Sequence, residues 1–165
     1  MFVLFRTLVY STLFIGFFLV FLPGEVIEWS GLIRPPSIGV AHVLALAIAA
    51  VGAILALWCI GTFALRGRGT PAPFDPPRQL VVSGPYRIVR NPMYLGAGLA
   101  LVGAGLFFRS VPLLGYLAAF MASTYLFVHW YEEPALRRTF GSDYEDYCRR
   151  VPRWFPRTGR GALKR

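Results

Sequence analysis

Four long apolar runs constrain the fold of this chain more than any other feature. A helix needs about 20 apolar residues to cross the hydrocarbon core of a bilayer. The runs occupy Phe2–Leu22, Ile38–Leu65, Met93–Phe108 and Pro112–Tyr131. The third run is short for a span, and only Arg109-Ser110-Val111 separates it from the fourth, which predicts a tight helical hairpin. We therefore expect an all-α membrane protein with about four transmembrane helices.

The composition indicates that lipid is the main solvent. Of the 165 residues, 56% are hydrophobic and 15% are charged, whereas soluble domains carry about 25% charged residues. The formal net charge of +9 is compatible with a nucleic-acid partner, but the basic residues flank the apolar runs. That pattern is expected beside an anionic cytoplasmic leaflet. We therefore predict membrane lipids, and no nucleic acid, as partners.

The length suits a single integral membrane domain over residues 1–165. We divide it into an N-terminal helical pair (1–65), a loop (66–92), the helical hairpin (93–131) and a tail (132–165). Phe-Leu-Pro-Gly follows the first run in place of a small-residue cleavage site, so we expect a retained helix that Pro23-Gly24 ends. Cys59 and Cys148 lie far apart without a CxxC spacing, which argues against a disulfide framework.

The distribution of basic residues predicts the orientation in the membrane. The loop after the first run holds Glu25, Glu28 and a single Arg34, whereas residues 66–91 hold five arginines and the tail holds nine more Arg or Lys residues. Positive residues stay on the cytoplasmic side. We expect the long loop and both termini to be cytoplasmic, in the inner membrane of a prokaryote. Arg109, on the opposite side, can snorkel to the outer interface.

The long loop is rich in proline, whereas the hairpin is rich in glycine. Residues 70–78 read T-P-A-P-F-D-P-P-R, and these prolines exclude a helix and favour an extended path. Irregular backbone cannot face lipid, so we expect this segment at the interface, packed on the protein or around a ligand. The hairpin instead contains Gly96, Gly98, Gly103 and Gly105, which predict close packing between helices.

Two polar stretches flank the hairpin. The first, G-P-Y-R-I-V-R-N-P-M-Y-L-G, spans Gly84–Gly96, and its Asn91-Pro92 pair is typical of a helix start. Free N–H groups there, beside Arg90, suit an anionic group. The second stretch spans Tyr131–Pro156 and opens with Glu132-Glu133 at the end of the last apolar run. Because the hairpin is tight, both stretches emerge on one face, and together they suit a small zwitterionic or cationic ligand.

The pairing of GPYRIVRNPMY with EEPALRRTFGSDYEDYCRRVPRWFP resembles the isoprenylcysteine carboxyl methyltransferase family, whose wider relatives include bacterial phospholipid methyltransferases. The resemblance covers about Pro77–Pro156. It implies S-adenosylmethionine as methyl donor, in a cytoplasmic pocket capped by the C-terminal tail. It also implies a lipophilic substrate that enters sideways from the bilayer. The prenylcysteine enzymes usually carry His where this chain has Asn91, so an acid–base role at that position is in doubt, whereas a capping role survives.

The residue types suit that chemistry. Glu132 or Glu133 can take the ammonium or ribose hydroxyls of the donor, and Arg90 with the helix start can take its carboxylate. Tyrosines can face the sulfonium by cation–π contact. The predicted catalytic residues are Glu132, Glu133 and Arg90. The predicted cofactor-binding residues are Tyr86, Arg90, Asn91, Pro92, Tyr94, Glu132, Glu133, Tyr144 and Tyr147. Methyl transfer needs mainly alignment and exclusion of water, although an amine acceptor must first be deprotonated, for which Glu132 and Glu133 are the nearby carboxylates.

Several alternatives stay open. Glu132-Glu133 can be a solvated helix end that opposes the helix dipole, with Glu133 paired to Arg137, and the tyrosines can be ordinary interfacial aromatics. His129 and the acids supply too few ligands for a metal, so no metal site is predicted. A non-enzymatic membrane scaffold or a small transporter subunit is the alternative function, but a transporter needs polar residues at mid-span, where this chain has almost none. The methyl acceptor (a carboxylate, a phospholipid amine, a thiol or a phenol) and the oligomeric state are not determined.

Overall fold

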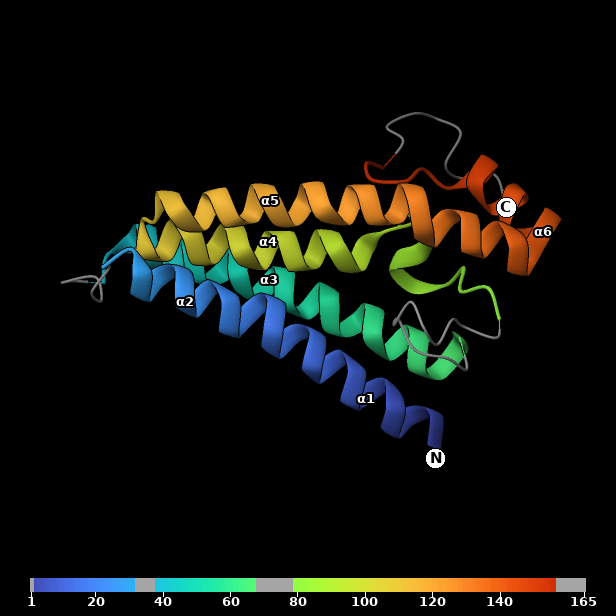
Figure 1. The fold of residues 1–165 in the computed structure, drawn as a ribbon, viewed down its shortest axis with the longest axis horizontal. Helices are drawn as coiled ribbons and strands as arrows, with labels where there is room; N and C mark the ends of the chain where they lie inside the picture. Colours follow the sequence, from blue (N-terminus) through green and yellow to red (C-terminus); the bar gives the residue numbers. More distant parts are fainter. Residues whose placement is uncertain (1, 32–37, 68–78, 157–165) are drawn as a thin grey trace.

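The computed structural model describes residues 2–31, 38–67 and 79–156 (Figure 1). Every regular element within these residues is a helix, which confirms the predicted all-α class. The elements in chain order are α1 (Phe2–Ile15), the π-helix η1 (Gly16–Phe21), α2 (Leu22–Trp29), α3 (Val40–Thr62), the π-helix η2 (Phe63–Gly67), the 3-10 helix η3 (Gly84–Arg87), α4 (Pro92–Phe108), α5 (Val111–Phe127), the π-helix η4 (Val128–Glu132) and α6 (Glu133–Arg150). The proline-rich residues 70–78 of the long loop lie outside the described residues.

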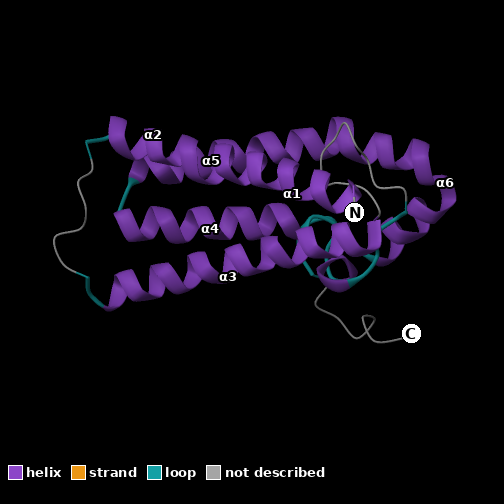
Figure 2. Cartoon of the chain, turned by 90° about the horizontal axis from the view of Figure 1, so that it is seen from below, coloured by secondary structure: helices purple, strands orange, loops and turns teal. Residues whose placement is uncertain are grey.

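Three helices are long and apolar enough to cross a membrane, so this is a membrane protein. They are Val9–Trp29, Val40–Gly67 and Val111–Arg150. Within the third of these helices, only residues 111–131 form an apolar stretch. α4 is apolar too, but its 17 residues fall below the roughly 20 that a span requires. The fourth span therefore stays a prediction. Figure 2 shows these helices side by side.

α3 and α4 pack with their backbones in contact. A Cβ atom added at Gly103 would lie 2.4 Å from the backbone nitrogen of Ala49, and one added at Gly52 would lie 2.4 Å from that of Ala100. Only glycine leaves room for so close an approach. In lipid the hydrophobic effect does not drive helices together, so van der Waals contact of this kind holds them. The close packing predicted from the hairpin glycines is confirmed.

α4 and α5 form the expected tight hairpin. Arg109 closes α4 in the left-handed conformation, with φ 49° and ψ 40°. The Ser110 backbone N–H donates to the Gly105 carbonyl at 3.0 Å. The Ser110 hydroxyl then accepts the Leu113 N–H at 3.2 Å and caps α5. Arg109 and Ser110 therefore reverse the chain in two residues, because Arg109 is the C-cap of α4 and Ser110 is the N-cap of α5.

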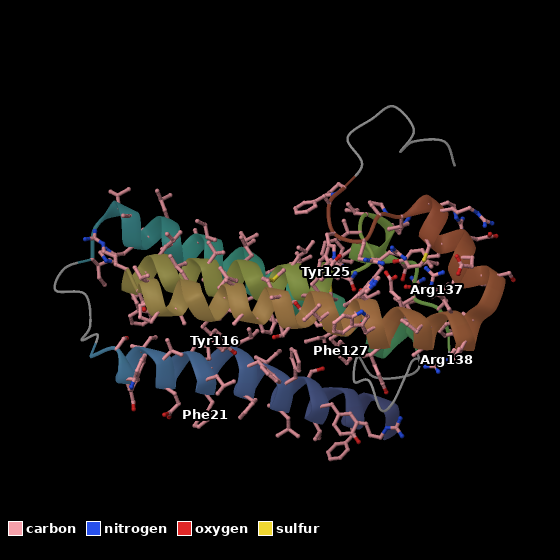
Figure 3. All side chains as sticks on the ribbon, turned by 45° about the horizontal axis from the view of Figure 1, so that its top comes forward. Phe21, Tyr116, Tyr125, Phe127, Arg137 and Arg138 are labelled. Atoms are coloured by element: carbon pink, nitrogen blue, oxygen red, sulfur yellow. The ribbon has the colours of Figure 1, made fainter. Side chains whose placement is uncertain are left out.

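Pro23 does not end the first helix, contrary to the prediction. The chain stays helical because η1 widens the turn before it: the Leu22 N–H donates to the Phe17 carbonyl, a π-type bond. Neither Leu22 nor Pro23, which has no N–H, donates to the Phe18 carbonyl. The Tyr116 hydroxyl of α5 donates to that carbonyl at 2.7 Å instead (Figure 3). A bond between helices thus satisfies a backbone group that water cannot reach.

The last helix continues past its apolar part in the same way. The Glu133 N–H donates to the Val128 carbonyl, a π-type bond, immediately before Pro134. The interpretation of Glu132-Glu133 as a helix C-terminus is therefore wrong. Glu133 begins α6 within this continuous helix, so neither acid lies at a helix end. Glu132 follows the apolar stretch and lies outside the membrane-spanning part.

A kink in α6 turns the chain back over the bundle. Gly141 has φ 51° and ψ −125°, a conformation that other residues rarely adopt. The second half of α6 and the segment 151–156 then fold back over residues 79–91 (Figure 1). Tyr144, Tyr147 and Val151 form the core of this contact, with Leu80 packed against them. We call residues 79–91 and 132–156 together the polar end.

Candidate active site

Main-chain hydrogen bonds tie the C-terminal segment to the start of α4. The Arg90 N–H donates to the Pro152 carbonyl at 2.9 Å, and the Asn91 N–H donates to the Arg153 carbonyl at 3.3 Å. Asn91 occupies the N-cap position, as predicted, but its side chain forms no capping hydrogen bond. Its amide nitrogen donates to the same Arg153 carbonyl at 3.2 Å. The predicted side-chain cap is therefore wrong, because this amide holds the C-terminal segment, and buried Pro92 begins the helix.

Glu133 lies at the centre of a buried ion cluster. It accepts two hydrogen bonds from Arg153, at 2.7 Å from Nε and 2.6 Å from Nη2. Arg90 approaches the same carboxylate at 3.2 Å, with the two side chains only 11% and 5% exposed. The hydrogen bonds that Arg153 donates to Glu133 raise the pKa of Arg153 above its usual range. We call Arg90, Glu133 and Arg153 the Glu133 cluster; the predicted pairing of Glu133 with Arg137 is its outermost contact, at 4.0 Å.

Glu132 faces a different partner. The Tyr94 hydroxyl, from α4, donates to its carboxylate at 3.1 Å. Among the described residues, no arginine or lysine forms an ion pair with Glu132. Burial raises the pKa of the Glu132 carboxyl to about 7, although the hydrogen bond from Tyr94 lowers it. Two adjacent acids therefore have separate environments, one neutralised by arginines and one paired with a neutral hydroxyl.

The remaining predicted tyrosines hold the C-terminal part of the chain in place. We call this part, residues 133–156, the cap. Tyr144 and Tyr147 are buried on α6, and the Tyr147 hydroxyl donates to the Tyr86 carbonyl at 2.7 Å. The Tyr86 ring packs edge-on against Phe63, with 5.1 Å between ring centroids. Burial raises the pKa of Tyr86 well above its usual value, so its hydroxyl stays neutral. These three residues join the cap to the loop and, through Phe63, to η2.

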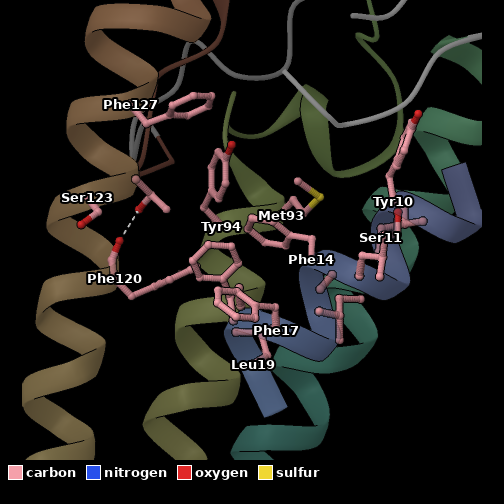
Figure 4. Close-up of a pocket in the computed structure, with 17 residues that line it drawn as sticks. Tyr10, Ser11, Phe14, Phe17, Leu19, Met93, Tyr94, Phe120, Ser123 and Phe127 are labelled. Carbon is pink, nitrogen blue, oxygen red and sulfur yellow. Dashed lines mark hydrogen bonds between the residues drawn. The ribbon is translucent and has the colours of Figure 1, made fainter. Parts of the chain in front are cut away.

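A largely apolar cavity of about 550 Å³ adjoins the polar end. It lies where the N-terminal helix diverges from the bundle, because α2 packs against α5 whereas α1 packs against η2. Its lining includes Phe14 and Phe18 of the first helix, Ile60 of α3, Tyr94 and Ala97 of α4, and Phe120 of α5. Figure 4 shows the Tyr94 hydroxyl directed away from Phe120 and Phe17. Since that hydroxyl binds Glu132, Tyr94 connects the cavity to the polar end.

Some buried polar atoms of this region have no hydrogen-bond partner. They include Arg90 Nε and Trp154 Nε1 at the polar end, and the Ser11 hydroxyl in the cavity wall. An unpaired buried donor costs free energy, of the order of 1–3 kcal/mol. Such donors are therefore suited to a ligand that accepts hydrogen bonds. Arg90 and Trp154 suit an anionic group, because both present N–H donors on segments that are bonded together.

Sequence reasoning missed two contributions. Arg153 was counted only as a tail charge, although it lies within the R-R-V-P-R-W-F-P end of the second motif. The first helix was given no role in a site, yet it supplies one wall of the cavity. The four closely spaced phenylalanines Phe14, Phe17, Phe18 and Phe21 were the available signal, but aromatic side chains facing lipid give the same pattern.

Comparison with known proteins decides the family. The model of the phospholipid methyltransferase family matches residues 40–143, which include α3, the hairpin and the start of the cap. The chain belongs to this family. The membership confirms the resemblance found in the motifs, and the matched residues contain Arg90, Tyr94, Glu132 and Glu133.

Two curated proteins are similar to this chain. The nickel-cobalt-cadmium resistance protein NccN of Alcaligenes xylosoxydans xylosoxydans is 35% identical over 101 residues, which are 61% of this chain and 43% of that protein. The cobalt-zinc-cadmium resistance protein CzcN of Cupriavidus metallidurans is 31% identical over 130 residues, 79% of this chain and 54% of that protein. The chain thus spans about half the length of these relatives. No solved structure matches. Within the described residues, no three His, Cys, Asp or Glu side chains are grouped as a metal site.

Proposed function

We propose that this protein is an S-adenosylmethionine-dependent methyltransferase that acts on a lipophilic acceptor held in the membrane. The observation that carries the proposal is the hydrogen bond between Tyr94 and Glu132, which connects an apolar cavity to a polar, arginine-rich cap. An apolar acceptor and a charged donor need these two surroundings side by side. Membership of the phospholipid methyltransferase family supports the same reaction class.

The polar end suits the amino-acid part of the donor. S-adenosylmethionine, when bound, supplies a methyl group already activated on a sulfonium sulfur. Arg90 Nε and Trp154 Nε1 are unpaired buried donors suited to a carboxylate, and Glu133 holds Arg90 and Arg153 in place beside them. We propose that Asn91 and Pro92 place Arg90, and that Tyr86, Tyr144 and Tyr147 hold the cap over it. Excluding water and aligning the two reactants is then the main work of the protein.

The acceptor is proposed to enter sideways between α1 and α5. Leu13 and Phe17 line the cavity and are also 64% and 48% exposed, so the cavity opens on the side where lipid would lie. An apolar chain in the bilayer reaches this opening without crossing water. We further propose that the polar end faces the cytoplasm in the inner membrane of a prokaryote, where the donor is made. A reporter fused at Trp29 should then be active outside the cytoplasm, and a cytoplasmic signal there would contradict this orientation.

Calorimetric titration with S-adenosylhomocysteine tests the donor. The purified protein should bind it, and its free energy of unfolding should rise by about 2.7 kcal/mol at a hundredfold excess over the dissociation constant. Transfer of tritium from methyl-labelled S-adenosylmethionine into a lipid extract tests the reaction itself. Absence of both binding and transfer would favour the alternative, a non-enzymatic scaffold or a small transporter subunit.

A further inference from the structure

We propose that Ser11 of the first helix selects the acceptor by donating a hydrogen bond to a neutral oxygen, of a hydroxyl or a carbonyl, on the part of the acceptor that lies in the cavity. The inference rests on the proposed function and deepens it, because it names a chemical feature of the substrate. Ser11 lies outside residues 40–143, which match the family model. The selectivity is therefore a feature that the first helix adds to the matched part of the chain.

The Ser11 hydroxyl is buried without a hydrogen-bond partner. The residue is 6% exposed, its oxygen is unpaired, and it lines the cavity. Among the described residues that line the cavity, no other buried side chain carries an unpaired polar atom. Figure 4 shows Ser11 on the first helix, on the opposite side of the cavity from Ser123 and Phe127 of α5. The buried part of the cavity wall therefore offers its free hydrogen-bonding capacity at this point.

Other helical hydroxyls are satisfied by their own helix. The hydroxyls of Thr62, Thr124 and Thr139 each donate to the carbonyl oxygen four residues earlier, at 2.8–3.0 Å. Thr124 also lines the cavity, so its hydroxyl and that of Ser11 have the same kind of surroundings. Ser11 forms no such bond in the structure. Its hydroxyl therefore keeps both its donor and its acceptor capacity for a ligand.

The surroundings of Ser11 decide which kind of ligand group is suitable. Among the described residues, no charged side chain lines the cavity, and aromatic rings such as Phe14 form much of its wall. An ionised group there would lose its hydration without gaining a counter-charge, which is costly. A hydrocarbon chain would leave the Ser11 hydroxyl unpaired, whereas a neutral oxygen satisfies it. A site with a buried hydrogen-bonding group rejects analogues that lack the partner, so Ser11 favours a chain that carries an oxygen.

An oxygen of the acceptor suits Ser11 better than a water molecule does. A buried water is usually held by about two to four polar groups. The hydroxyls of Thr124 and Tyr94, which also line the cavity, are already engaged. An oxygen that is covalently part of the acceptor needs only the bond to Ser11, because its apolar chain is held by the rest of the cavity. The cavity volume of about 550 Å³ lies within the range of small-molecule sites.

A ketone and the hydrocarbon of the same chain length test the contact. Dihexyl ketone and tridecane differ by one mid-chain oxygen, and each is added to the protein in a neutral detergent, where binding raises the thermal unfolding temperature. The ratio of their affinities is measured for the wild type and for Ser11→Ala, so that partition into the detergent cancels. We expect the ratio to favour the ketone roughly threefold to tenfold more in the wild type than in Ser11→Ala. An equal ratio in the two proteins would overturn the inference.

Two other hydroxyls serve as controls. Thr12→Ala removes the neighbouring exposed hydroxyl of the first helix, and the affinity ratio should stay at its wild-type value. Ser123→Ala removes a hydroxyl that lines the cavity from α5. A ratio that falls in Ser123→Ala and not in Ser11→Ala would place the ligand oxygen at α5 and contradict the assignment.

Competition connects the contact to the acceptor. Dihexyl ketone should inhibit tritium transfer from methyl-labelled S-adenosylmethionine into a lipid extract, and Ser11→Ala should weaken this inhibition by the same factor. The variant should also raise the apparent KM for the extract with kcat unchanged, since a hydrogen bond to the chain acts equally in the ground state and the transition state.

The same measurements separate failure of the inference from failure of the proposed function. Ser11→Ala should keep S-adenosylhomocysteine affinity within about twofold. Binding of the ketone without inhibition of methyl transfer would show that the acceptor does not use Ser11, and the inference would fail. If S-adenosylhomocysteine does not bind while the ketone ratio holds, the proposed function fails instead and the ligand contact of Ser11 stands.

Discussion

The two sides of the bundle are packed in opposite ways. On one side, the backbones of α3 and α4 touch through glycines, and an added Cβ at Gly103 would approach the Ala45 carbonyl to 2.6 Å. On the other side, the first helix meets the bundle through large aromatic side chains, with a cavity of about 550 Å³ between them. The hydrogen bond from the Tyr116 hydroxyl to the Phe18 carbonyl crosses that side.

The tightly packed side positions the Glu133 cluster, and the loosely packed side contains the cavity. Arg90 lies two residues before α4, so the Glu133 cluster is positioned by the tightly packed pair. The cavity lies on the loosely packed side, where we propose that the acceptor enters. Donor binding should therefore depend on the tight side and acceptor turnover on the loose side, and the two can be perturbed separately.

The largest effect is expected from breaking the tight side. Gly103→Ala places a Cβ 2.4 Å from the Ala49 backbone nitrogen, so α3 and α4 must separate. We expect a loss of about 3 kcal/mol in the free energy of unfolding, measured by thermal or chemical denaturation in detergent. Gly61→Ala is the matched control, because no atom lies within 4 Å of its added Cβ. The control should gain about 0.5–1 kcal/mol, and equal effects at both glycines would contradict the comparison.

The next effect concerns the cluster that the tight side supports. Arg153→Ala removes two charge-assisted hydrogen bonds from Glu133. A loss of about 1.5–3 kcal/mol in S-adenosylhomocysteine binding is expected, roughly tenfold to hundredfold in affinity by calorimetry. Arg90→Ala and Glu133→Gln should behave similarly. Arg138→Ala, an exposed arginine of α6, is the control and should bind normally. Normal binding by all three cluster variants would show that these charges serve only topology and packing.

A smaller and more selective effect is expected on the loose side. Ser123→Trp adds a large ring at a residue that lines the cavity from α5. Acceptor methylation should fall by about tenfold or more, roughly 1.4 kcal/mol, with S-adenosylhomocysteine affinity unchanged. Ala122→Trp, the same ring on the neighbouring exposed residue, should keep its activity. Equal losses in the two variants would mean that the acceptor does not use this cavity.

The smallest effect concerns the unpaired hydroxyl in the cavity wall. Ser11→Ala removes a buried oxygen that has no hydrogen-bond partner, so the ligand-free protein should gain up to about 1 kcal/mol in the free energy of unfolding. Ser110→Ala removes a hydroxyl that caps α5 and should lose about 1 kcal/mol. Denaturation of both variants compares them directly. A loss at Ser11 similar to that at Ser110 would show that its hydroxyl is already satisfied.

Much of the architecture could be predicted, because lipid allows few solutions for the backbone. Apolar runs of span length must be helices, and only Arg109-Ser110-Val111 separated the last two runs. The same reasoning failed at Pro23 and at Glu132-Glu133, where helices were expected to end. Local propensity marks proline as a stop, but a π-type turn before Pro23 and before Pro134 keeps each helix continuous.

The sequence by itself determined the membrane class, the hairpin and the gathering of the two polar motifs at one end, since these follow from hydropathy and a short connection. Only the tertiary structure decided how the charges are shared. The kink at Gly141 returns the tail to the start of α4, which brings Arg153 to Glu133 across 20 positions of sequence. The π-type turn of η4 lets Glu132 reach Tyr94 while Glu133 faces the arginines. Adjacent residues with the same side chain look equivalent in a sequence, and only their packing partners distinguish them.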